Sequence, residues 1–144
     1  MKYVSFEIAK KLKELGFNER CKAVWYNDSG THETTLKYLH PEWFLDPKND
    51  GFKNVQLKEY NGAHWEYIGA PTQEEVLSWL RNTHKLHIYA FHTELWYGTE
   101  WCYEVEKMDE GWTYSKHHGM EYEECIEEAI KYTLENFVKD EPKE

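Results

Sequence analysis

Residues 70–81 read Ala70-Pro71-Thr72-Gln73-Glu74-Glu75-Val76-Leu77-Ser78-Trp79-Leu80-Arg81, and this stretch carries the sharpest local signal in the chain. Thr72 and Glu75 have the spacing of a capping box, in which each side chain accepts a hydrogen bond from the other residue's backbone N–H. Apolar residues then recur at helical intervals, as expected for a face turned to a core. The pattern predicts a helix that begins at Thr72 and ends near Thr83 or His84.

Three strands are predicted after this helix. Residues 86–92 are rich in β-forming side chains, and residues 101–106 alternate apolar and polar positions. Within 101–106, Cys102, Glu104 and Glu106 would lie on the wet face. The turn residues 109–111 then lead into a short return strand at 112–115. These segments predict an antiparallel meander.

A second long helix is predicted over residues 121–138, at the end of the meander. An almost continuous apolar stripe runs along it at helical spacing, and Cys125 belongs to that stripe. Glutamates cover the outer side and crowd the first two turns, where negative charge suits the positive end of the helix dipole. The residues after 139 are polar and predict a frayed tail.

The part of the chain before residue 70 is more varied. Ser5 predicts the N-cap of a helix over 5–15, which Gly16 would end. Strands are expected at 21–26 and 34–39, joined as a hairpin by a polar loop. From 40 to 69 the sequence is rich in Pro, Gly, Asn and Asp breakers, with room for one or two short strands.

The predicted class is therefore α+β, with an antiparallel sheet packed against about three helices in the order α-β-β-α-β-β-β-α. We expect one domain over residues 1–140, with an irregular insertion at about 40–69. Residues 141–144 would form a polar tail. A chain of 144 residues is long enough to bury a firm core without a disulfide or a metal.

The composition is acidic and unusually aromatic. The net charge is −10, from 27 acids and 17 bases, and the chain holds seven Trp, eleven Tyr and six Phe. A protein that binds the phosphate backbone of nucleic acids needs positive charge, so the sequence argues against nucleic acid as a partner. The sequence contains no apolar run long enough to span a membrane, so no membrane partner is expected. The first residues lack the apolar core of a signal peptide, and we therefore expect a cytoplasmic location.

Aromatic residues gather in the meander, and five of them form a candidate interaction patch. In an antiparallel sheet several of these rings would fill the core, while one or two left exposed would anchor a partner. The five residues are Trp96, Tyr97, Trp101, Trp112 and Tyr114.

No catalytic, cofactor or metal site is predicted. His87 and His92 lie an odd number of positions apart on one strand and therefore on opposite faces, while His117 and His118 are adjacent in an expected loop. The three cysteines form no CxxC pair and are expected to be reduced. Cys102 would be exposed between Glu100 and Glu104, whose charges would raise the pKa of the thiol.

A resemblance runs through the helical segments. Residues 5–17, the segment 70–81 followed by His84-Lys85-Leu86-His87-Ile88, and residues 122–130 together resemble a family of small proteins of Bacteroides-type bacteria, their phages and mobile elements. The resemblance covers roughly half of the chain, and Cys125 stands where the family usually has Ala. It implies an α+β fold and a bacterial or phage setting. The family has no assigned activity, so the resemblance implies no site.

The C-terminal half also has the element order of double-stranded-RNA-binding domains, which is helix, three antiparallel strands, helix. Those domains place lysines at the start of the last helix, where they contact phosphates. Here that position holds Glu121, Glu123 and Glu124. The order of elements fits such a domain, and the charges argue against RNA binding.

Three functions are left open by the sequence. The leading one is a non-enzymatic module that binds a protein partner or a second copy of itself through an aromatic patch rimmed with acids. The second is an acidic mimic that occupies a nucleic-acid-binding protein. The third is a metal- or thiol-dependent enzyme, which would need reactive side chains to converge from a set comprising His84, His87, His92, His117, His118 and Cys102.

Overall fold

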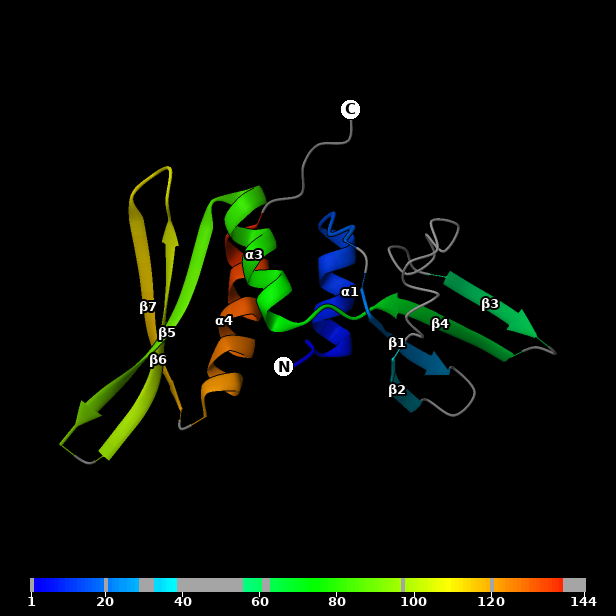
Figure 1. The fold of residues 1–144 in the computed structure, drawn as a ribbon, viewed down its shortest axis with the longest axis horizontal. Helices are drawn as coiled ribbons and strands as arrows, with labels where there is room; N and C mark the ends of the chain where they lie inside the picture. The colour runs from blue at the N-terminus through cyan, green and yellow to red at the C-terminus, as the bar shows by residue number, and fades with distance from the viewer. Residues whose placement is uncertain are drawn as a thin grey trace. The chain divides into compact units, whose positions relative to one another are not determined.

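The computed structural model describes residues 2–19, 21–28, 33–38, 56–60, 63–96, 98–119 and 121–138. These residues form three helices and seven strands, and the strands pair only in antiparallel fashion. The α+β class is thereby confirmed. By its internal contacts the chain divides into two compact units, Tyr3–Pro71 and Thr72–Lys139, the latter joined by the first two residues (Figure 1). The expected single domain over 1–140 stays a prediction, and the 141–144 tail lies outside the described residues.

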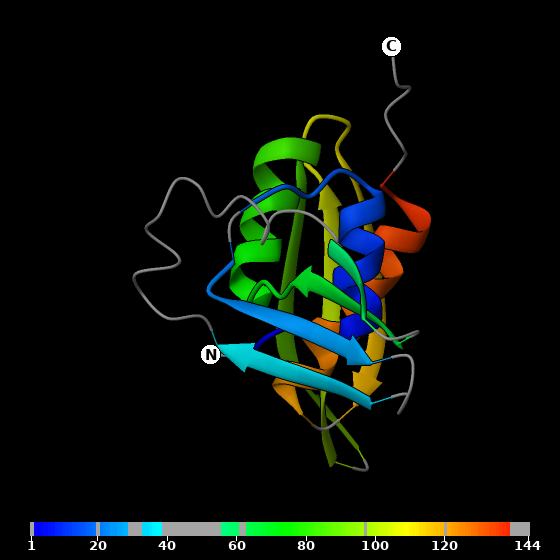
Figure 2. The same cartoon turned by 90° about the vertical axis from the view of Figure 1, so that its right-hand side faces the viewer.

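The N-terminal unit combines one helix with a four-stranded sheet. Its elements are α1 (Phe6–Glu14), β1 (Ala23–Asp28), β2 (Glu33–Tyr38), β3 (Gln56–Tyr60) and β4 (Ala63–Gly69). The strand order is β2-β1-β4-β3, and α1 contacts β4. In Figure 2 the antiparallel β1 and β2 cross the front of the view in blue and cyan.

Both predicted ends of α1 are confirmed. The Ser5 Oγ accepts a hydrogen bond from the Ile8 N–H at 3.2 Å. At the other end Gly16 adopts φ +96°, a value that favours glycine, and the Phe17 N–H donates to the Leu12 carbonyl at 2.9 Å. These bonds satisfy backbone groups that a helix end leaves without an intrahelical partner.

Residues 56–69, expected to belong to an irregular insertion, form the two strands β3 and β4. β4 lies between β1 and β3, so this hairpin extends the sheet that β1 and β2 begin. Pairing with β1 gives the backbone groups of β4 partners that the local sequence alone does not supply. Residues 40–55 lie outside the described part of the chain.

The C-terminal unit has the order α-β-β-β-α. Its elements are α3 (Gln73–His84), β5 (Leu86–Leu95), β6 (Gly98–Lys107), β7 (Trp112–Gly119) and α4 (Tyr122–Asn136). The three strands form a second, separate sheet in the order β5-β6-β7. α3 contacts β5, α4 contacts all three strands, and Figure 1 shows both helices on the same side of this sheet. The strands that the structure describes thus form two sheets, where the sequence led us to expect one.

The capping box predicted at the start of α3 is present in full. The Glu75 N–H donates to the Thr72 hydroxyl at 3.2 Å, and the Thr72 N–H donates to the Glu75 carboxylate at 3.1 Å. At the far end Lys85 closes the helix in the left-handed conformation, with φ 58°. The predicted end near Thr83 or His84 is correct.

Aromatic contacts join the sheet of this unit to α4. Trp112 lies with its ring centre 4.8 Å from that of Phe137, and Tyr114 stacks on Tyr132 at 4.7 Å with the ring planes 6° apart. Tyr103 of β6 is fully buried in the same layer. Such ring pairs contribute roughly 0.5–1.5 kcal/mol each beyond the area they bury.

All three strands of the meander are longer than the sequence predicted. β5 continues to Leu95 rather than ending at His92, β6 spans Gly98–Lys107 rather than 101–106, and β7 continues to Gly119 rather than Ser115. His117 and His118, which we expected in a loop, therefore lie within β7. Pairing between neighbouring strands stabilises the added lengths, because alternate residues along them gain ladder hydrogen bonds.

We predict that Thr72→Ala lowers the free energy of unfolding by about 1 kcal/mol, because the Glu75 N–H loses its acceptor at the start of α3. Urea denaturation followed by circular dichroism measures this change. The control is Thr83→Ala, which removes the same atoms from an exposed threonine in the last turn of α3. Equal losses in both variants would contradict a role for the capping box.

Candidate functional site

The β5-β6-β7 sheet has one face covered by α3 and α4 and an opposite face, which we call the helix-distal face. Leu86, Ile88, Tyr103 and Val105 are buried on the helix side. Since side chains alternate along a strand, their neighbours in sequence lie on the other face. The helix-distal face comprises His87, Tyr89 and Phe91 from β5, Cys102, Glu104 and Glu106 from β6, and Thr113 and Ser115 from β7.

An aromatic row runs along β5 on this face. The ring centres of His87 and Tyr89 lie 5.5 Å apart, and those of Tyr89 and Phe91 lie 6.2 Å apart. Tyr89 and Phe91 are each 37% exposed, although they lie within a ten-residue strand rather than at its ends. Their exposure leaves ring surface for contact with another molecule.

Two carboxylates of β6 lie beside the aromatic row. The strand register sets Glu104 opposite Tyr89 and Glu106 opposite His87. Glu104 accepts hydrogen bonds from both sides, one from the Tyr89 hydroxyl and one from the Ser115 hydroxyl at 3.2 Å. Glu104 therefore connects side chains of all three strands.

The environment of the Tyr89 hydroxyl raises the pKa of this phenol. The hydrogen bond to Glu104 is the largest cause, because it holds the proton on the phenol oxygen. Partial desolvation and the negative charges of Glu104 and Glu106 act in the same direction. Tyr89 therefore stays neutral, and it presents its ring next to two negative charges.

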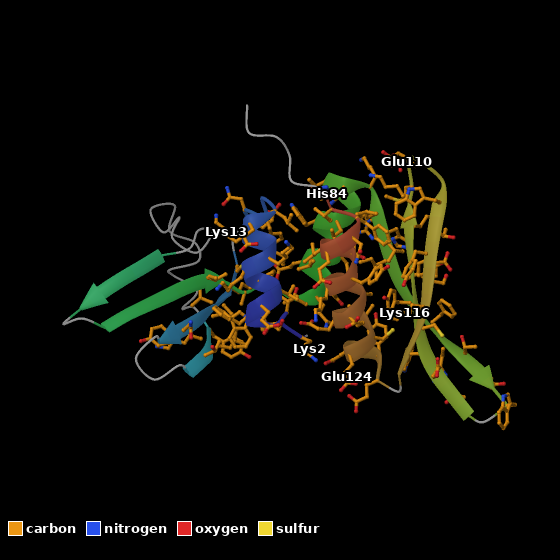
Figure 3. The ribbon with its side chains drawn as sticks, turned by 180° about the vertical axis from the view of Figure 1, so that it is seen from behind. Lys2, Lys13, His84, Glu110, Lys116 and Glu124 are labelled. Atoms are coloured by element: carbon orange, nitrogen blue, oxygen red, sulfur yellow. The ribbon has the colours of Figure 1, made fainter. Side chains whose placement is uncertain are left out.

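The lysines of this sheet lie on the other side. Lys107 donates from its Nζ to the His84 carbonyl at 2.6 Å and lies 3.4 Å from an Asp109 carboxylate oxygen. The Nζ of Lys116, labelled in Figure 3, lies 5.9 Å from the ring centre of Tyr132 in α4. No lysine or arginine occupies a described position on the helix-distal face. Its rings and carboxylates together suit a cationic group, which is attracted by both.

The structure does not bring the candidate aromatic patch together as one surface. Trp112 and Tyr114 pack against α4. Trp101 contacts His92, with ring centres 4.9 Å apart, and Tyr122, at 5.1 Å. Trp96 is 95% exposed at the end of the β5–β6 hairpin. Tyr97 lies outside the described residues.

The histidines have the arrangement that alternation predicts. His87 lies on the helix-distal face, whereas His92 contacts Trp101 on the helix side. His84, at the end of α3, packs its ring against that of Trp79 at 4.7 Å. Among the residues that the structure describes, no three side chains of the metal-ligating types come together.

The cysteines are all buried thiols. The expected exposure of Cys102 is wrong: this residue is only 2% exposed, and its Sγ donates to the Thr93 hydroxyl at 3.4 Å. Cys125 lies in the buried stripe of α4, as predicted. Burial, followed by the nearby Cys102, raises the pKa of Cys125 to about 11. A thiol with this pKa is a poor nucleophile at neutral pH because little of it is ionised.

The start of α4 keeps the acidic character seen in the sequence. Glu121, Glu123 and Glu124 are all exposed there, and Figure 3 labels Glu124. The α-β-β-β-α order expected from the comparison with double-stranded-RNA-binding domains is confirmed, with both helices on one face. Phosphates would meet repulsion at the very helix end where those domains bind them.

The aromatic row was missed at the sequence level, although a signal for it was present. In residues 86–91 Leu, Ile and Ala alternate with His, Tyr and Phe, so both faces of the strand carry apolar or aromatic groups. A strand that is apolar on both faces, within a sheet covered by helices on one side only, must expose one set. The acidic neighbours Glu104 and Glu106 were correctly placed on the wet face.

Comparison of the chain with models of known protein families, with curated proteins and with solved structures gives no significant match. The resemblance to the Bacteroides-type family therefore stays a prediction. Within the described residues no helix has both the length and the apolar character that crossing a membrane requires.

We predict that Glu104→Gln lowers the pKa of Tyr89 toward its ordinary value, because the amide replaces the charge that favours the neutral phenol. Titration of the tyrosine ring carbon by NMR measures the shift. Glu110→Gln serves as the control, since Glu110 bonds Trp112 at the far turn. An unchanged Tyr89 pKa in Glu104→Gln would show that the hydrogen bond does not form.

We also predict that Cys125 resists alkylation in the native protein. Raising its pKa from 9.0 to about 11 lowers its thiolate fraction near pH 8 by about a hundredfold, and burial blocks the reagent as well. Iodoacetamide labelling with and without urea, read by peptide mass spectrometry, measures the protection. Rapid labelling of Cys125 in the native protein would contradict this prediction and would make the thiol a candidate nucleophile.

Proposed function

We propose that this chain is a non-enzymatic protein-binding module, and that it binds a positively charged segment of a partner protein on the helix-distal face. One observation carries the proposal: the exposed row of Tyr89 and Phe91 lies beside Glu104 and Glu106, while the lysines of the sheet lie on the opposite side. Rings and acids thus share a face that a cation can approach.

The physical chemistry of such a face favours lysine and arginine over neutral side chains. A cation over an aromatic ring gains about 0.5–1 kcal/mol at an exposed site and more when it is desolvated. An arginine can also form two parallel hydrogen bonds with a carboxylate. The hydrogen bond from Tyr89 to Glu104 keeps the phenol neutral beside the carboxylate, so the ring and the negative charge are presented together.

The bonding of Glu104 also favours a protein partner over the nucleic-acid mimic. A mimic needs carboxylates arrayed outward like phosphates, whereas Glu104 is turned into a network with Tyr89 and Ser115. An enzyme would need reactive groups that converge. Cys125 is instead buried with a raised pKa, and His87 and His92 point to opposite faces.

Selection of binders from a random-peptide display library tests the proposal. We expect the immobilised protein to enrich peptides with several Lys or Arg residues, and we expect the double variant Tyr89→Ala, Phe91→Ala to bind them about tenfold more weakly. The rings are exposed, so their removal should leave the fold intact, which circular dichroism checks.

A matched control removes two exposed rings elsewhere, in Tyr38→Ala, Trp96→Ala; these residues are 71% and 95% exposed. The control should bind like the unaltered protein. Enrichment of neutral or acidic peptides, or loss of binding in the control alone, would overturn the proposal.

A further inference from the structure

The two edges of the β5-β6-β7 sheet differ in how open they are to another strand. β5 pairs only with β6 and β7 pairs only with β6, so each has a second edge without a strand among the described residues. Exposed sheet edges tend to pair with other chains, and proteins usually protect them with lysine, proline or a bulge. The two edges of this sheet differ in whether they carry lysine, proline or a bulge.

The β7 side carries such protection. Lys116 lies within the strand, and a bulge interrupts the pairing of β6 with β7 between Trp101 and Cys102. A bulge increases local twist and breaks the regular ladder. A further strand would therefore meet an irregular and positively charged edge on this side.

The β5 side lacks each of these features. β5 is ten residues long, contains no lysine, arginine or proline, and pairs with β6 in unbroken register along its whole length. Its one charged residue, Glu94, lies near the end. No described side chain from Tyr89 to Glu94 is buried. A regular, unguarded edge of this length suits the addition of a strand.

We propose that the partner binds as an added β-strand along Tyr89–Glu94, with lysine or arginine at alternate positions. This inference rests on the function proposed above and specifies the form of the partner. In an added strand, alternate side chains lie on the helix-distal face, next to Tyr89 and Phe91. The carboxylates of Glu104 and Glu106 lie one strand farther in, about 10 Å away by strand spacing. A long cationic side chain that crosses the Tyr89 ring can approach them.

Charge selects a cationic partner strand over a second copy of this chain. A second copy pairing through β5 would bring another Glu104 and Glu106 to the same face, and each chain has a net charge of −10. Like charges at such a junction oppose pairing. A cationic side chain of an added strand that crosses the Tyr89 ring instead approaches the opposite charge of Glu104, which lies across from Tyr89.

The test uses a synthetic peptide of about eight residues that alternates arginine with valine. Two further peptides have the same sequence with N-methyl groups on every second residue. One carries them on the odd-numbered residues and the other on the even-numbered residues. Because an added strand directs every second backbone N–H to its neighbour, one N-methylated peptide should bind about tenfold or more weakly and the other should retain affinity. Hydrogen exchange of alternate β5 amides in 89–94 should slow by about tenfold on binding, with β7 amides unchanged.

Charge is tested separately with a matched pair of variants. Glu104→Gln, Glu106→Gln should weaken the arginine–valine peptide by about tenfold, whereas Glu123→Gln, Glu124→Gln makes the same change of net charge on α4 and should have little effect. Circular dichroism confirms that both variants fold. Equal weakening in the two variants would overturn the role of the helix-distal carboxylates.

Several results would overturn strand addition. Equal binding of the two N-methylated peptides, protection of β7 rather than β5, or failure of the arginine–valine peptide to bind would each do so. The proposed function would remain supported in these cases if the display library still yields basic peptides whose binding requires Tyr89 and Phe91. Protection of β5 that rises with protein concentration in the absence of peptide would assign the edge to a second copy and also overturn the inference.

Discussion

The C-terminal unit depends on the alternation of side chains along β6, the central strand of its sheet. Tyr103 and Val105 point toward the helices and are fully buried, while Glu104 and Glu106 point the other way. Reversing these directions would bury two carboxylates and expose two apolar groups, at a cost of several kcal/mol. Residues that pair across neighbouring strands point to the same face of a sheet. The orientation of the β6 side chains therefore fixes which residues of β5 and β7 lie on each face.

The same constraint separates charges across the sheet. Lys107 and Lys116 occupy helix-side positions, where they contact the His84 carbonyl and the Tyr132 ring. Among the described residues of this sheet, the carboxylates on the other face consequently have no lysine or arginine beside them. Glu104 is instead held by the Tyr89 and Ser115 hydroxyls, which leave its negative charge in place. The helix-distal face thus combines order with unneutralised charge, two properties that favour selective recognition of cations.

Local sequence sufficed for features whose causes are local. The capping box at Thr72 and Glu75, the glycine that ends α1 and the outward direction of Glu104 and Glu106 each depend on residues a few positions apart, and all were predicted. Pairing between distant segments was harder to predict. β3 and β4 are stabilised by β1, and the separation of the strands into two sheets depends on contacts that no short window contains. For the site, the sequence placed Glu104 and Glu106 on a wet face but put the candidate aromatic patch at Trp96, Tyr97, Trp101, Trp112 and Tyr114, of which Trp112 and Tyr114 pack against α4. The alternation in 86–91 showed that one set of β5 side chains must be exposed, but tertiary packing decides which face the helices cover, so the sequence did not show that Tyr89 and Phe91 were that set.

The direction of side chains on β5 has a consequence for how this protein can change over time. Leu86 and Ile88 contribute to the core, whereas Tyr89 and Phe91 point to the helix-distal face and are partly exposed. Substitutions on the outward positions therefore carry little penalty in folding, and surface changes of this kind usually alter stability by less than about 0.5 kcal/mol. A lineage can exchange these few side chains, and with them the chemistry of this face, while inheriting an unaltered scaffold.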